Sequence, residues 1–184
     1  MYIETEATPN PDTLKFLPDV PVMTAGTAHY VRTDDASTSP LAGALFGLVG
    51  VEGVFLGQDY VSVTKAADRD WDALKTDVLA ALLTFFTSGA PVFTGRQEQD
   101  LVVDEKAEDA DIIEQIKTLL DEKIRPAVAG DGGDIVYRGF EDGVVYLQMQ
   151  GACAGCPSST ITLKHGIENL LKYYVPEVVD VRPV

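Results

Sequence analysis

The sequence VVYLQMQGACAGCPSST, residues 144–160, decides how the second half of this chain folds. Its first seven residues follow the turn sequence EDG, a pattern typical of the second strand of a β-hairpin. Pro157 lacks an amide hydrogen and has a preset φ angle, so it suits the first position of a helix. Between this strand and this helix lie the chain's two cysteines, Cys153 and Cys156. The stretch therefore predicts a strand, a CxxC loop and a helix in succession.

The residues around the two cysteines favour reactive thiolates. Gly151 and Gly155 allow the backbone to turn closely around whatever the sulfur atoms hold. Cys156 falls at or near the N-cap of the predicted helix, where unpaired backbone N–H groups and the helix dipole stabilise negative charge. Both effects lower the pKa of a thiol and favour the thiolate, which is the form that binds metals.

Four interpretations of this CxxC loop stay open on the residues alone. The cysteines could be buried core residues, a redox-active dithiol, ligands of a structural zinc ion, or ligands of an iron–sulfur cluster. Zinc and cluster sites normally need four protein ligands. The only histidines are His29 and His165, and His165 lies more than two turns into the predicted helix. A metal centre on this loop would therefore need two chains, each contributing one CxxC.

Composition excludes several classes of protein. The net charge is −15, with 14 Lys and Arg against 29 Asp and Glu, whereas a nucleic-acid-binding protein needs a basic surface. No run of about 18 apolar residues exists, so we expect no membrane-spanning helix. The N-terminus resembles neither a secretory signal nor a mitochondrial transit peptide. In a reducing compartment, CxxC spacing indicates metal binding or redox chemistry rather than a disulfide framework.

Residues 1–93 predict a first α+β domain. Short strands are expected at 2–7, 13–17 and 28–32, and a hairpin over 51–65 turns at residues 57–59. Ser39 is a candidate N-cap for a helix that begins at Pro40. A second helix is expected over DRDWDALKTDVLAALLTFFTSG, residues 68–89, with acidic residues in its first turn and Gly89 at its end. Its apolar face is formed by Trp71, Leu74, Val78, Leu82 and Phe85.

Residues 94–109 are mostly polar and charged and predict a linker to a second domain, residues 110–184. This domain begins with an amphipathic helix over 110–124, which Pro126 is expected to end. The sequence DGGD, residues 131–134, predicts a tight turn whose glycines have positive φ. The order is helix, strand, strand, CxxC loop, helix and strand. We therefore expect an α+β fold of two small α/β-sandwich-like domains.

The second domain closely resembles the C-terminal domain of the NifU-like, or Nfu-type, iron–sulfur scaffold and carrier proteins. The matching segments are IRP (124–126), DGGDI (131–135), GACAGCPSS (151–159), TLKHGIE (162–168) and PEV (176–178). The first domain resembles the N-terminal Nfu domain. Its matching segments are TPNPDTLKFLPD (8–19), SPLAGALF (39–46), VEGVFLGQDYVSVTK (51–65) and DWDALK (70–75).

This resemblance implies a [4Fe–4S] cluster, or a [2Fe–2S] cluster, held by Cys153 and Cys156 and shared between two chains. It implies a carrier rather than an enzyme: a homodimer that receives the cluster from an upstream assembly scaffold and passes it to apo client proteins. No nucleic acid or membrane partner is expected. The expected location is the bacterial cytoplasm, or the mitochondrial matrix if a transit peptide has been removed. The alternatives are a CxxC dithiol oxidoreductase and a zinc-bridged adaptor.

Overall fold

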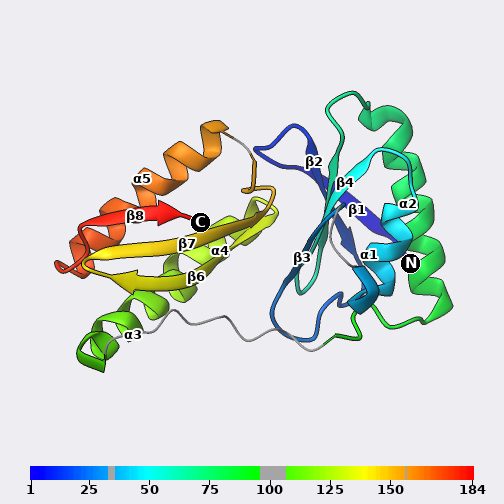
Figure 1. Cartoon of the computed structure of the whole chain (residues 1–184). Helices are drawn as coiled ribbons and strands as arrows, with labels where there is room; N and C mark the ends of the chain where they lie inside the picture. Colours follow the sequence, from blue (N-terminus) through cyan, green and yellow to red (C-terminus); the bar gives the residue numbers. More distant parts are fainter. Residues whose placement is uncertain (33–35, 96–106, 156) are drawn as a thin grey trace. The chain divides into compact units, whose positions relative to one another are not determined.

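The chain divides into two units, Met1–Gln97 and Glu98–Val184, which we treat separately. The structure is a computed structural model that describes residues 1–32, 36–95, 107–155 and 157–184 (Figure 1). The side chains of residues 157–159 are outside this description. The predicted linker, residues 94–109, lies largely outside the described residues, so the predicted domain boundaries stay predictions. Within the described part of the chain, no helix is long and apolar enough to cross a lipid bilayer.

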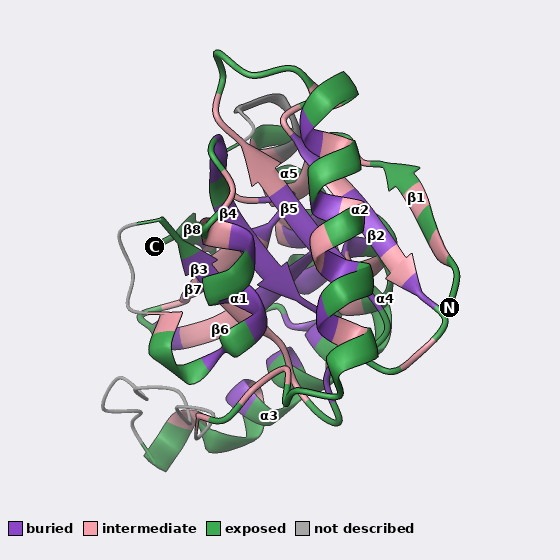
Figure 2. Cartoon of the chain, turned by 90° about the vertical axis from the view of Figure 1, so that its right-hand side faces the viewer, coloured by how far each residue is buried: buried purple, intermediate pink, exposed green. Residues whose placement is uncertain are grey.

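The first unit is an antiparallel five-stranded sheet with strand order β1-β2-β5-β4-β3. The strands are β1 (Ile3–Ala7), β2 (Thr13–Pro18), β3 (Ala28–Val31), β4 (Val51–Leu56) and β5 (Val61–Lys65). Figure 2 shows α1 (Pro40–Phe46) and α2 (Trp71–Ser88) in front of this sheet, with buried residues between them. A short 3₁₀ helix, η1 (Ala36–Thr38), precedes α1.

The start of α1 and the end of α2 fall at the residues that the sequence predicts. Ser39 is the N-cap of α1, because its side-chain oxygen accepts the N–H of Ala42. Gly89 ends α2 in the left-handed conformation with φ 70°. The predicted apolar face of α2 packs into the core, with Leu74, Val78, Leu82 and Phe85 buried and Trp71 partly buried at its edge.

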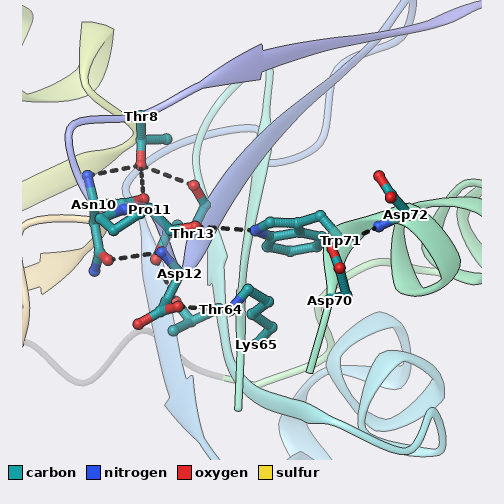
Figure 3. A network of polar contacts seen from close by, with 10 residues as sticks. All are labelled: Thr8, Asn10, Pro11, Asp12, Thr13, Thr64, Lys65, Asp70, Trp71 and Asp72. Carbon is teal, nitrogen blue, oxygen red and sulfur yellow. Dashed lines mark hydrogen bonds and ion pairs between the residues drawn. The ribbon is translucent and has the colours of Figure 1, made fainter. Parts of the chain in front are cut away.

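Polar contacts hold the loop between β1 and β2 against the start of α2 (Figure 3). Asn10 Oδ1 accepts the N–H of Asp12 (3.0 Å), and Lys65 Nζ donates to Asp12 Oδ1 (2.6 Å). The indole N–H of Trp71 donates to the carbonyl of Pro11 (3.1 Å). These bonds use the loop's polar groups within the unit itself, so the proline-rich turn has a structural role here.

The second unit combines a three-stranded sheet, strand order β6-β7-β8, with helices. After a short 3₁₀ helix, η2 (Ala107–Asp109), its elements are α3 (Ala110–Leu119), the π-helical turn η3 (Leu120–Ile124), α4 (Arg125–Gly130), β6 (Gly133–Glu141), β7 (Val144–Gly151), α5 (Pro157–Tyr174) and β8 (Asp180–Pro183). β6 and β7 form an antiparallel hairpin, and α5 connects β7 to the parallel strand β8. The predicted order of elements and the α+β class are confirmed.

The hairpin turn and the unit's core follow the sequence signals. Asp142 and Gly143 both have positive φ, 48° and 80°, as a two-residue turn after EDG requires. The core unites the apolar sides of helices and sheet, which places the helices against one layer of strands. Its members include Ile113, Ile116, Leu120, Ile124, Ile135, Leu147, Ile167, Leu171 and Val181.

The expectation that Pro126 ends the first helix of this unit is wrong. Helical structure continues to Gly130, because the π turn places a wider loop of backbone ahead of the proline. The N–H of Arg125 bonds to the carbonyl of Leu120, five residues back. Pro126 therefore falls in the first turn of α4, the part of a helix in which proline is best tolerated.

Ser39→Ala should destabilise the first unit. The Ser39 hydroxyl, fully buried, caps α1 and also donates to the carbonyl of Val92 (2.7 Å). Removing it costs a cap and leaves a carbonyl without this donor, so we expect the free energy of unfolding to fall by about 2 kcal/mol. Urea unfolding followed by the fluorescence of Trp71, the only tryptophan, measures this.

The matched control is Ser88→Ala. The Ser88 hydroxyl lies at the exposed end of α2 and donates to the carbonyl of Phe85 (2.6 Å). Because that end of the helix is open to water, this change should cost less than about 0.5 kcal/mol. Equal losses in the two variants would contradict the role of Ser39.

Candidate metal centre

Cys153 sits in a tight turn directly after β7. Its side chain is buried, with 5% of the residue's surface exposed. Gly151 and Gly155 flank it with φ 63° and 79°, a conformation that other L-residues rarely adopt. The N–H of Ala154 closes the turn on the carbonyl of Gly151 (3.1 Å). The two glycines that the sequence marks as turn residues therefore fix the direction in which the chain leaves the strand.

In the DGGD loop, the backbone of Gly132 and Gly133 forms a wall beside Cys153. Gly132 has φ 81° and its carbonyl accepts the N–H of Ala152 (3.1 Å). Gly133 pairs with Gly151 at the end of the β6–β7 ladder. A methyl group on the Cα atom of Gly133 would lie 2.8 Å from Cys153 Sγ and 2.6 Å from the carbonyl oxygen of Gln150. Gly133 is thus required for close approach rather than for a positive φ, whereas Gly132 serves the predicted turn.

An ion pair between the half-exposed Arg125 and the buried Asp134 lies beside this wall. Asp134 is 4% exposed, and its carboxylate accepts hydrogen bonds from Nε (2.8 Å) and Nη2 (2.6 Å) of Arg125. The hydrogen bond to Asp134 is the main cause that raises the pKa of the Arg125 guanidinium above its ordinary value. Neither residue of this pair is predicted as a site residue from the sequence. The only signal was that both residues lie in segments, IRP and DGGD, that carry the family resemblance.

The helix after the CxxC loop begins at Pro157, as predicted. Its N-terminus follows Cys153 by four residues, so the positive end of the helix dipole belongs to the same segment. The Thr160 hydroxyl makes a long bond to the carbonyl of Cys153 (3.5 Å). Cys156 lies outside the described residues, and its predicted place at the N-cap stays a prediction.

Within the second unit, His165 does not join Cys153. His165 is exposed on α5, and His29 lies on β3 of the first unit with its ring 6.2 Å from that of Phe55. Among the described side chains, no group of three or more His, Cys, Asp or Glu residues lies close enough to hold a metal ion. The donors at this loop that the sequence supplies are therefore the two thiols, Cys153 in its walled turn and Cys156.

Both units match known family models. Residues 116–182 match the NifU-like domain, and residues 3–89 match the domain described as scaffold protein Nfu/NifU N terminal. A solution structure of a NifU-like protein from Saccharomyces cerevisiae is 25% identical and covers 52% of this chain and 86% of its own, with a TM-score of 0.47.

Similarity to curated proteins extends over the whole chain. The human protein named NFU1 iron-sulfur cluster scaffold homolog, mitochondrial, is 47% identical over 185 residues, which are 100% of this chain and 72% of that protein. NifU-like protein 5, mitochondrial, of Arabidopsis thaliana is 49% identical over 183 residues, 97% of this chain and 66% of its own length. Both domains and this identity show that the protein belongs to the Nfu-type family of iron–sulfur cluster scaffold proteins.

Proposed function

We propose that this protein carries an iron–sulfur cluster as cargo on Cys153 and Cys156 and delivers it to apo client proteins. The observation that carries the proposal is the walled turn around Cys153, where glycine backbone surrounds a buried thiol directly before a helix N-terminus. Such surroundings hold the sulfur in one position, which suits a metal ligand. The relatives that share both domains are named iron–sulfur cluster scaffolds.

The number of thiols supports a cluster shared by two copies of the chain. One chain has two cysteines, and a [4Fe–4S] cluster takes four cysteine ligands. Two copies, each contributing Cys153 and Cys156, complete the set. The cluster would therefore bridge a homodimer, and its release would separate the ligand sets. A [2Fe–2S] cluster with the same four thiolates is the alternative cargo.

Transfer is a ligand exchange rather than a catalysed reaction. An incoming client thiol loses its proton as its sulfur binds iron, and the carrier thiolate that leaves iron takes up a proton, so no electron is gained or lost. An upstream scaffold would load the carrier by the same exchange in reverse. The first unit would serve recognition of these partners. Because the relatives are named as mitochondrial, the mitochondrial matrix is a compartment consistent with this role.

Anaerobic reconstitution of the full chain tests the cargo. With iron and sulfide supplied, we expect about four iron and four sulfide per dimer, the composition of one cluster with four cysteine ligands. Cys153→Ala and Cys156→Ala should each abolish uptake, because either change removes two of the four ligands from the dimer. Metal analysis together with the mass of the loaded species measures both.

Two other results of that experiment would each contradict the proposal. One zinc ion per dimer with no uptake of iron would indicate the zinc-bridged adaptor. A monomer whose metal-free form reduces the disulfides of insulin, with a thiol pKa well below about 8.5, would indicate a dithiol oxidoreductase.

Gly133→Ala should damage the cluster site. The added methyl group would meet Cys153 Sγ and the Gln150 carbonyl at distances below 3.0 Å. Gln150 belongs to the paired end of the hairpin and Cys153 to the turn that follows it. We expect a loss of iron uptake and a decrease in the free energy of unfolding of about 1–3 kcal/mol, because overpacking shifts the backbone. Iron content after reconstitution and urea unfolding measure these effects.

Gly130→Ala is the matched control from the same segment. Its Cα atom has open space on the side where a methyl group would be added, and it closes α4 without a positive φ. Alanine there should leave iron uptake unchanged and stabilise the unit by up to about 1 kcal/mol. If both variants lost iron to the same extent, the contact between Gly133 and Cys153 would not be the cause.

A further inference from the structure

Asp134 and Arg125 form a directional link between α4 and the first residues of β6. The Asp134 carboxylate accepts hydrogen bonds from Nε and Nη2 of Arg125 and from the backbone N–H of Ile135 (2.8 Å). Arg125 donates from Nη1 to Asp121 (3.0 Å), one helical turn earlier. Asp121 and Asp134 therefore hold the guanidinium between them. Because the two N–H groups that Arg125 directs at Asp134 lie in one plane, they fix the orientation of that carboxylate.

The Arg125–Asp134 pair is joined by the chain to the wall beside Cys153. Asp134 follows Gly133, whose Cα atom lies against Cys153 Sγ, and Asp134 is paired with Gln150 on β7. The Gly132 carbonyl binds Ala152, the residue before the cysteine. A shift of Asp134 would consequently move the backbone that faces the sulfur.

Stability alone does not explain why a charged pair occupies this place. Ile124 and Ile135, the chain neighbours of Arg125 and Asp134, are both buried in the apolar core. The Asp134 carboxylate is buried whereas the Arg125 side chain is 38% exposed, so the desolvation cost falls mainly on Asp134. An apolar residue of similar size at a buried charged position often stabilises a protein equally well. What an ion pair adds is direction, because its hydrogen bonds are satisfied in one arrangement of α4 and β6 only.

We propose that the pair Arg125–Asp134 is a positioning device for the Cys153 thiolate. It holds Gly132 and Gly133 against the sulfur, and so limits how readily another thiol or electrophile reaches it. Neither residue contacts the cargo in this scheme. The inference rests on the proposed function, because it takes Cys153 to be a cluster ligand whose exchange rate matters.

The first test measures the reactivity of Cys153 without any cluster. In full-length protein carrying Cys156→Ser, Cys153 is the only thiol, and its alkylation by iodoacetamide is followed by mass spectrometry. Asp134→Asn replaces one carboxylate oxygen by an NH₂ group, which cannot accept a hydrogen bond, so the paired bonds from Nε and Nη2 of Arg125 cannot both form. We expect alkylation to become about tenfold faster, because the wall opens more often by local fluctuation.

Two further variants separate positioning from loss of stability. Val181→Ala makes a cavity among core residues on β8 and leaves Gly132 and Gly133 unchanged. Denaturant is then adjusted until Val181→Ala and Asp134→Asn have the same free energy of unfolding. At that point Asp134→Asn should still be alkylated about tenfold faster. Arg125→Lys keeps the charge but loses the fork, so its rate should lie between those of wild type and Asp134→Asn, and it replaces Asp134→Asn if that variant does not fold.

The second test uses reconstituted protein with Cys156 restored. At equal initial loading, iron release to excess EDTA should be faster for Asp134→Asn than for Val181→Ala. Equal alkylation rates and equal rates of iron release in Asp134→Asn and Val181→Ala would overturn the positioning role, even if the wild-type protein binds its cluster. A wild type that takes up no iron would refute the proposed function instead, and with it the inference, whatever the alkylation rates.

Discussion

The backbone of Gly133 passes so close to the Cys153 sulfur that only a hydrogen atom fits on its Cα atom. This contact constrains the second unit from two directions. The chain must reverse at Gly132, with φ 81°, so that β6 can begin against the end of β7. It must also leave β7 at Gly151, with φ 63°, so that the thiol points back to the wall. The position of the thiol thus follows from turns that only glycine accommodates without strain.

In both units, hydrogen bonds from side chains tie a loop or a strand to a neighbouring element, but the outcome differs. In the first unit, the indole of Trp71 and the ammonium of Lys65 donate to the turn between β1 and β2. They fix this turn to the start of α2 and the end of β5. In the second unit, the pair Arg125–Asp134 ties α4 to the strand behind a thiol. The second of these contacts bears on the thiol that we propose as a cluster ligand, because rigid backbone beside Cys153 limits the motion of its sulfur. Rigid surroundings lower the entropy lost when a thiol binds a ligand.

Local signals predicted much of the fold, because each acts between residues a few positions apart. Ser39 caps the helix that Pro40 begins, and Asp142–Gly143 makes the tight turn of a hairpin. The burial of one face of α2 follows from its helical period. The same local logic failed at Pro126, where a π turn lets the helix continue. That turn is stabilised by Leu120 and Ile124, whose burial depends on strands elsewhere in the unit.

The sequence by itself determined the CxxC loop, the glycines around it, the helix that follows and the order of elements in both units. Tertiary structure alone decided what surrounds Cys153. The strand register brings Gly133 to Gly151, and the continuation of the helix to α4 brings Arg125 to Asp134. Neither contact follows from sequence spacing, because each depends on how a strand and a helix pack on a shared core. Periodicity specifies which face of an element is apolar, whereas packing specifies which neighbours that face acquires.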